Sequence, residues 1–363
     1  MLSLTGRPLL VLTALAAVVA VAATVAVATG RIQVPRFLAR RRGAHGVTVL
    51  ALVVVAQLLA VSSVALSVND SYDFYASWRD ALGLTSTGGS LIKVGGLVRA
   101  GEGQALIRTV HRHPAGRDDQ LIVWLPPQYH RPAYRHRRFP VLMFVSGQPS
   151  TPHIAFRNFD FAKVASREIA TGRMPPFIGV FPTLMVSPPR DTECTDIPGG
   201  PQAESWLSHD VPHYLTRHFR ADPLGPNWSV TGFSTGGFCS AKLLLAHPGR
   251  FSSAASLGGY FRPIQDSTTG SLFRGNRVLQ EHNSPLWLYR HGNMHHGRLL
   301  VVASRQDHEA WRAAKPFLHL AAGDRKVSRL ISAVGGHNYR TYAGMLPRTL
   351  QWLSRSWQVP AGA

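Results

Sequence analysis

A serine between two glycines is the feature of this sequence best suited to chemistry. Residues 232–236 are Gly-Phe-Ser-Thr-Gly and fit the Gly-x-Ser-x-Gly pattern of a nucleophile elbow, in which the serine occupies a strained turn between a strand and a helix. The apolar run 227–231 predicts the strand, and the run 237–247, with its Ala and Leu side chains, predicts the helix. The pattern predicts that Ser234 is a nucleophile, with an ordinary glycine turn as the alternative.

An acid and a histidine follow Ser234 in the sequence, each shortly after a strand-like run. The strand-like run 297–304 is followed by Asp307, and the strand-like run 327–334 is followed by His337. A serine hydroxyl needs an imidazole to take its proton and a carboxylate to orient that imidazole. The chain order Ser, Asp, His is that of the α/β-hydrolases and differs from the orders of the two serine protease families. Glu309 is the alternative acid, because it follows the same strand.

The catalytic half of the chain resembles the "putative esterase" branch of the α/β-hydrolases, which includes the antigen 85 mycolyltransferases and S-formylglutathione hydrolase. The resemblance covers residues 90–357 and implies that Ser234 is the nucleophile, Asp307 the acid and His337 the base. Antigen 85 takes its acid from a glutamate in a helix, which keeps Glu309 open. The segments that carry the resemblance are residues 205–212, 231–237, 247–259 and 335–337.

The same resemblance implies an oxyanion hole made of the backbone N–H groups of Thr235 and Gln148. In the family this second loop carries His-Gly or Asp-Gly after a strand, whereas here Ser146 precedes Gly147. The chemistry of acyl transfer also requires an oxyanion hole, because the reaction develops an oxyanion that two preorganised donors stabilise. Thr235 begins the predicted helix, so its N–H has no partner within that helix.

Two long uncharged segments, residues 8–30 and 46–69, precede the catalytic half. Each exceeds the roughly 20 residues that cross a hydrocarbon core. The loop between them holds five arginines and no acid, and the positive-inside rule places such a loop in the cytoplasm. We therefore expect a two-pass protein of the cell membrane whose catalytic domain is extracytoplasmic. The arginines are Arg31, Arg36, Arg40, Arg41 and Arg42.

This topology predicts three parts of the chain: a transmembrane hairpin over 1–69, a linker over 70–90 and a catalytic domain over 91–363. The first apolar segment has an alternative interpretation as a cleaved signal peptide, because residues 25–28 are small. Cleavage would leave the arginine loop outside, against the charge rule.

The chain has two cysteines, Cys194 and Cys239, and both fall in the catalytic half. In an oxidising compartment they form a disulfide candidate, with two unpaired thiols as the alternative.

We expect no cofactor and no metal. The histidine-rich residues 290–296 lack a carboxylate or cysteine at zinc-site spacing. The acids Asp191, Glu193 and Asp196 lack the glycine and terminal glutamate of a calcium loop, and indicate loop structure instead.

Net charge is +20, from 39 basic and 19 acidic residues. Such a surface favours anionic partners, here the lipid bilayer in preference to nucleic acid.

Alternating strand and helix patterns predict an α/β-hydrolase fold with a doubly wound, mostly parallel sheet. A longer helical pattern over 202–219 contains Pro212, which is expected to kink or divide it. The function expected from all this is a serine esterase or acyltransferase acting on acyl-ester or lipid substrates, with a sugar or lipid alcohol as a possible acceptor. The alternative is a non-catalytic envelope module that binds glycan or protein on the same scaffold.

Overall fold

The computed structural model describes residues 7–32, 44–72, 98–112, 117–292, 294 and 296–358. The chain divides into two compact units, Met1–Ser90 and Leu91–Ala363. Of the predicted arginine loop only Arg31 lies within the described residues, and the predicted linker lies outside them from residue 73 to residue 90.

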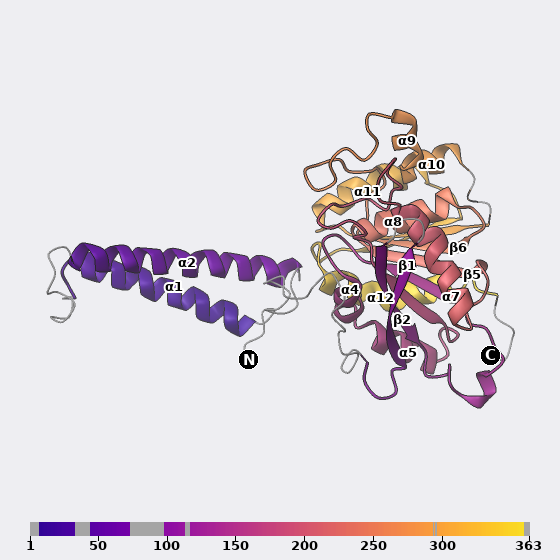
Figure 1. Ribbon diagram of the computed structural model, residues 1–363, viewed down its shortest axis with the longest axis horizontal. Coiled ribbons are helices and arrows are strands. Elements are labelled where there is room, and N and C mark those ends of the chain that lie inside the picture. Colours follow the sequence, from indigo (N-terminus) through magenta and orange to yellow (C-terminus); the bar gives the residue numbers. More distant parts are fainter. Residues whose placement is uncertain are drawn as a thin grey trace. The chain divides into compact units, whose positions relative to one another are not determined.

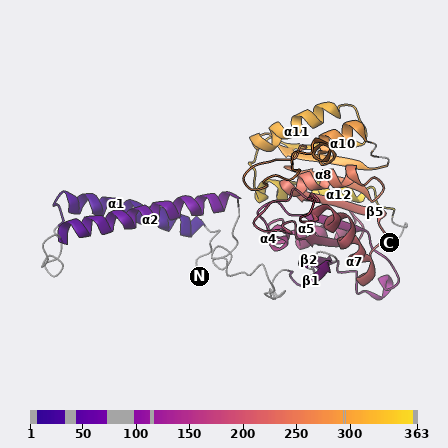
Figure 2. The same ribbon diagram turned by 45° about the horizontal axis from the view of Figure 1, so that its top comes forward.

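The first unit is a pair of helices, α1 (Arg7–Ala28) and α2 (Ala44–Tyr72), which pack against each other. They lie side by side in both Figure 1 and Figure 2. Large apolar side chains such as Leu15, Val47 and Leu58 are exposed along them. Both helices are long and apolar enough to cross a membrane by length and composition. Helix α2 runs three residues into the segment expected to be linker, where no glycine or proline ends it.

The second unit is built on an eight-stranded sheet with the order β1-β2-β4-β3-β5-β6-β7-β8. Strand β2 pairs antiparallel with β1 and β4, and every other pairing in the sheet is parallel. The predicted mostly parallel sheet is thereby confirmed. The strands are β1 (Gln104–Arg112), β2 (Arg117–Leu125), β3 (Val141–Val145), β4 (Ile178–Pro182), β5 (Gly225–Phe233), β6 (Phe251–Leu257), β7 (Arg298–Ser304) and β8 (Val327–Ser332).

Successive side chains along each buried strand point to opposite faces of the sheet, and helices cover both faces. In β5, Trp228 and Val230 belong to the core cluster that includes Phe238 of α8. The intervening Ser229 accepts a hydrogen bond from Trp357 Nε1, at the end of α12, over 2.8 Å. The helices are α4 (Pro152–Asn158), α5 (Phe161–Ala170), α6 (Ala203–Ser205), α7 (Val211–His218), α8 (Thr235–Ala246), α9 (Arg277–His282), α10 (Pro285–His291), α11 (His308–Leu320) and α12 (Tyr339–Ser354), with a 3₁₀ turn η1 (Pro132–Tyr134).

The helical pattern over 202–219 is divided, as Pro212 predicts. It forms α6, a π turn η2 (Trp206–Asp210) and α7. Pro212 lies in the first turn of α7, where the N–H that proline lacks would have no partner within the helix.

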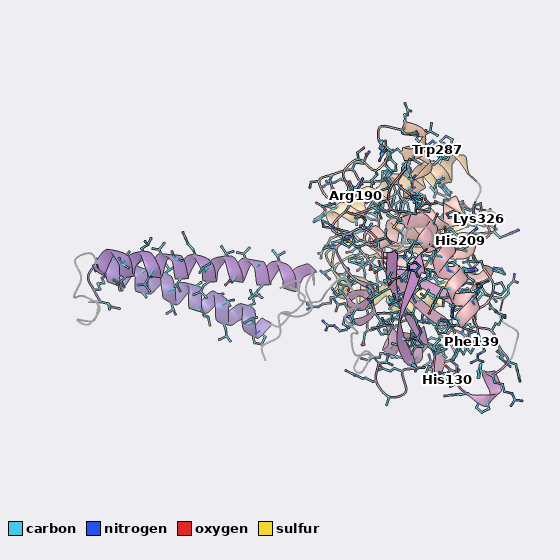
Figure 3. All side chains as sticks on the ribbon, in the orientation of Figure 1. His130, Phe139, Arg190, His209, Trp287 and Lys326 are labelled. Atoms are coloured by element: carbon cyan, nitrogen blue, oxygen red, sulfur yellow. A yellow bond between two sulfur atoms is a disulfide. The ribbon has the colours of Figure 1, made fainter. Side chains whose placement is uncertain are left out.

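All the loops that carry predicted catalytic side chains follow the carboxyl ends of parallel strands, and those ends share one edge of the sheet. In Figure 3, Phe139 and Lys326, which precede β3 and β8, lie on the right of the second unit, whereas Arg190, which follows β4, lies on the left. An α/β sheet places its ligand site at the edge formed by the carboxyl ends of its parallel strands.

Candidate active site

Ser234 occupies the turn between β5 and α8 with φ 58° and ψ −120°, a conformation that residues with a side chain rarely adopt. Its N–H donates to the carbonyl of Leu257 over 2.9 Å, which anchors the turn to β6. A side chain at Gly236 would lie 2.0 Å from the carbonyl oxygen of Val145, so only glycine fits there. The flanking glycine of the pattern therefore has a packing reason, and the serine side chain is half-buried at the sheet edge.

The structure brings the three predicted catalytic side chains together. His337 Nε2 lies 2.9 Å from Ser234 Oγ, and His337 Nδ1 lies 2.6 Å from Asp307 Oδ2. Strands β7 and β8 are parallel neighbours, which is why the residues that follow them meet although 30 positions separate them. The arrangement allows the imidazole to take a proton from the serine while the carboxylate holds its tautomer.

Asp307 is almost fully buried, and its carboxylate is well supplied with donors. Tyr342 donates to Oδ2 over 2.6 Å, and the N–H of Ala310 donates to Oδ1 over 3.2 Å as Asp307 caps α11. Burial raises the pKa of Asp307, but the hydrogen bonds from His337 and Tyr342 outweigh it and leave the pKa below its ordinary value. The alternative acid, Glu309, lies exposed on the first turn of α11.

The loop that carries His337 is fastened by contacts that the sequence did not indicate. Ser304 at the end of β7 donates to the carbonyl of Gly335 over 2.5 Å, and the Gly335 N–H donates to Gln306 Oε1 over 2.9 Å. The Phe233 ring stacks on the His337 imidazole with 4.8 Å between centroids. Together with Tyr342, these residues limit how far the imidazole can turn away from the serine. No local sequence pattern predicted a role for Tyr342, because it lies on α12 and reaches Asp307 only in the folded chain.

Of the two predicted oxyanion-hole residues, Thr235 directly follows Ser234, and Gln148 lies in a loop that passes beside it. Thr235 is the first residue of α8, and Gln148 follows Gly147 in the loop after β3. A side chain at Gly147 would lie 2.9 Å from the Phe233 carbonyl oxygen and 3.1 Å from Ser234 Cβ. The loop after β3 thus passes directly against the turn of Ser234 at Gly147, the residue before Gln148.

A disulfide joins Cys194, in the loop after β4, to Cys239 on α8, with 5.9 Å between Cα atoms. Beside it the fully buried Lys242 donates to the carbonyl of Cys194 over 2.8 Å and pairs with Glu204 over 2.9 Å. Burial alone would raise the pKa of Glu204, yet Lys242 and His247 lower it to about 2. A buried ammonium needs partners of this kind, and they join the loop of Cys194 and α6 to α8.

Among the residues that the structure describes, no group of three histidine, cysteine or acidic side chains is placed to hold a metal ion. Residues 293 and 295 of the histidine-rich segment lie outside that set.

Residues 113–361 match a family described as "Putative esterase". The chain belongs to this family of α/β-hydrolases. The resemblance inferred from the sequence is confirmed at the level of the family, whereas the antigen 85 branch remains a prediction.

A protein from Corynebacterium glutamicum described as uncharacterised is 25% identical over 246 residues, which are 64% of this chain and 56% of that protein. The chain therefore spans little more than half the length of this relative.

Solved structures share the α/β-hydrolase fold. A ferulic acid esterase superposes with a TM-score of 0.60 at 16% identity, covering 70% of this chain and 98% of that one. S-formylglutathione hydrolase from Agrobacterium tumefaciens gives 0.60 at 17% identity, covering 72% and 98%. FphF, a fluorophosphonate-binding serine hydrolase of Staphylococcus aureus, gives 0.58 at 16% identity, covering 69% and 98%. The predicted fold class is confirmed.

Proposed function

We propose that this chain is a membrane-anchored, extracytoplasmic serine esterase that works through an acyl-enzyme on Ser234. The supporting observation is the position of His337, within hydrogen-bond distance of both Ser234 Oγ (2.9 Å) and Asp307 Oδ2 (2.6 Å). A serine held in this way needs no cofactor to cleave an ester.

In the proposed reaction, Ser234 Oγ attacks the ester carbonyl carbon while His337 Nε2 takes the hydroxyl proton. The backbone N–H groups of Thr235 and Gln148 stabilise the oxyanion. Collapse of the intermediate breaks the ester C–O bond, and His337 gives its proton to the departing alcohol. Water then attacks the acyl-enzyme, His337 takes a proton from it, and the acid leaves as Ser234 recovers its proton.

The acyl-enzyme also sets the range of substrates that we propose. A sugar or lipid alcohol in place of water would make the same site an acyltransferase, with an acyl ester or lipid as donor. A similar fold belongs to a ferulic acid esterase, so aromatic acyl esters belong in the substrate panel beside aliphatic ones. Comparing release of free acid with formation of a new ester, with and without an added sugar alcohol, separates hydrolysis from transfer.

The nucleophile is tested with Ser234→Ala. The full chain in detergent should fold but lose ester turnover by about 10⁴-fold or more, because the residual activity of triad enzymes comes from binding and the oxyanion hole alone. A fluorophosphonate probe should label the wild type and a Ser252→Ala control, but not Ser234→Ala. Labelling at another serine overturns the assignment. A folded wild type that neither reacts with the probe nor turns over esters would instead support the non-catalytic binding module.

The membrane topology rests on two apolar helices and the arginines between them. A reporter that is active only outside the membrane should be active when fused after Gly89 and silent when fused within residues 36–42. Replacing these arginines with neutral residues should weaken the orientation, because positive charge sets it. Activity of the fusion within 36–42 would contradict the two-pass topology and favour the cleaved signal peptide.

A further inference from the structure

A second pair of acids lies buried near the nucleophile helix, and the proposed reaction does not use it. Glu193 is 1% exposed and Asp191 is 5% exposed, in the loop that the disulfide of Cys194 ties to α8. Glu193 and Cys194 both have positive φ, 50° and 45°, although neither is glycine. Backbone of this kind persists only where the surroundings impose it.

Hydrogen-bonding groups connect Glu193 to the residue that follows the nucleophile. The Tyr260 hydroxyl donates to Glu193 Oε1 and lies 3.3 Å from Thr235 Oγ1. The Ile264 N–H donates to Glu193 Oε2 over 3.3 Å. The Thr235 hydroxyl in turn faces Asp191, whose pKa it lowers as a hydrogen-bond donor. A continuous polar path therefore runs from Glu193 to Thr235, beside Ser234.

Glu193 faces two charged groups, Asp191 in the same loop and Lys242 on α8. Burial raises its pKa to about 8; the Asp191 carboxylate raises it further, while the Tyr260 hydroxyl and the Lys242 ammonium oppose the rise. Lys242 acts weakly because Glu204 already pairs with it. Burial also raises the pKa of Asp191, with Asp266 adding repulsion. At neutral pH, Glu193 accordingly keeps its proton, so the cluster does not hold a second buried negative charge beside that of Asp191.

We propose that Glu193 is a positioning residue whose charge acts, across the space that Tyr260 and Thr235 occupy, on the donors of the oxyanion hole. As a neutral acid it adds no charge to that of Asp191 near Thr235, and on ionisation it adds a second negative charge at the end of this polar path, which opposes the oxyanion that the Thr235 N–H would stabilise. Loss of the Glu193 proton then sets the alkaline limit of ester turnover. The inference rests on the proposed function of Ser234.

The first test is the pH profile of kcat/KM for p-nitrophenyl butyrate with the full chain. Wild type should lose about 10-fold in kcat/KM between pH 7 and pH 9.5, and Glu193→Gln should lose less than about 2-fold, because the amide cannot ionise. Glu281→Gln removes an acid of the same type from the surface, where it pairs with Arg277 over 2.9 Å, and should keep the wild-type profile.

Two neighbours should move the alkaline limit in opposite directions. Asp191→Asn removes a charge that raises the pKa of Glu193, so the limit should shift to lower pH. Tyr260→Phe removes a donor that lowers this pKa, so the limit should shift to higher pH. A merely structural role would not produce paired shifts of opposite sign.

Stability gives a readout that does not depend on activity. The pKa of Glu193 in the folded chain, about 8, is above its ordinary value of 4.5, so its contribution is complete below pH 4.5 and is lost as the pH rises to 8. Unfolding of the wild type in denaturant should show this loss, and Glu193→Gln should lack it.

The outcomes are separable. An unchanged alkaline limit in Glu193→Gln overturns the inference even when Ser234→Ala is inactive. Full activity of Ser234→Ala overturns the proposed function, while the pH dependence of unfolding still reports on Glu193. If Glu193→Gln does not fold, the opposite shifts in Asp191→Asn and Tyr260→Phe support the inference, and shifts in the same direction or none overturn it.

Discussion

Two buried carboxyls near the nucleophile helix, Asp307 after β7 and Glu193 after β4, have pKa values displaced in opposite directions. Burial raises both, but Asp307 receives hydrogen bonds from His337, Tyr342 and a backbone N–H and ends below its ordinary value. Glu193 has fewer compensating donors and a second carboxylate, Asp191, beside it, and ends at about 8. Burial therefore does not decide the charge of an acid in this site; the surrounding donors and charges do.

The two loops are also held by different means. Two hydrogen bonds of Gly335, one accepted from the Ser304 hydroxyl and one donated to Gln306 Oε1, fasten the loop of His337 to the end of β7. The loop of Glu193 is held by the disulfide of Cys194 and by Lys242, and Arg190 at its start donates to the carbonyls of Thr269 and Ser271. Both loops are held by several contacts to neighbouring elements, and the two acids differ in the donors and charges that surround them.

The largest effect that tests this comparison comes from Asp307→Asn. The amide keeps the shape but not the charge that holds the imidazole tautomer, so kcat/KM should fall by about 10³–10⁴-fold. Glu309→Gln, two residues further on and exposed, should change kcat/KM by less than about 2-fold. Initial-rate measurements at neutral pH on purified variants decide between them. The reverse pattern would transfer the acid's role to Glu309.

A smaller effect is expected from Tyr342→Phe, which removes one donor from Asp307. Turnover should fall by about 10-fold or less, and the free energy of unfolding by about 1.5–3 kcal/mol, because the lost hydrogen bond goes to a buried charged group. The pKa of Asp307 should rise, since Tyr342 lowers it. Tyr289→Phe is the matched control, because its hydroxyl donates to Asp324 over 2.7 Å away from the site, and turnover should not change. Equal losses in both variants would show that the donor to Asp307 has no special role.

Much of the fold was predictable because it depends on local patterns. Apolar runs bounded by glycine and polar residues marked the parallel strands, and their carboxyl ends must share an edge whatever the details of packing. For this reason the sequence was enough to predict that Ser234, Asp307 and His337 lie close together. Strand limits were less predictable: the strand-like run 327–334 is shortened to β8, which ends at Ser332, where its pairing with Ser304 of β7 ends.

The sequence by itself determined the chain order of Ser234, Asp307 and His337, the mostly parallel sheet, and two helices apolar enough for a bilayer. Only the tertiary structure decided which of two nearby acids meets His337, because the first turn of α11 buries Asp307 and exposes Glu309. It alone assembled Glu193, Tyr260 and Thr235, which belong to three separate segments and share no spacing rule. A pKa depends on what surrounds a group in space. Residues this far apart in the chain become neighbours only when the sheet and α8 have folded.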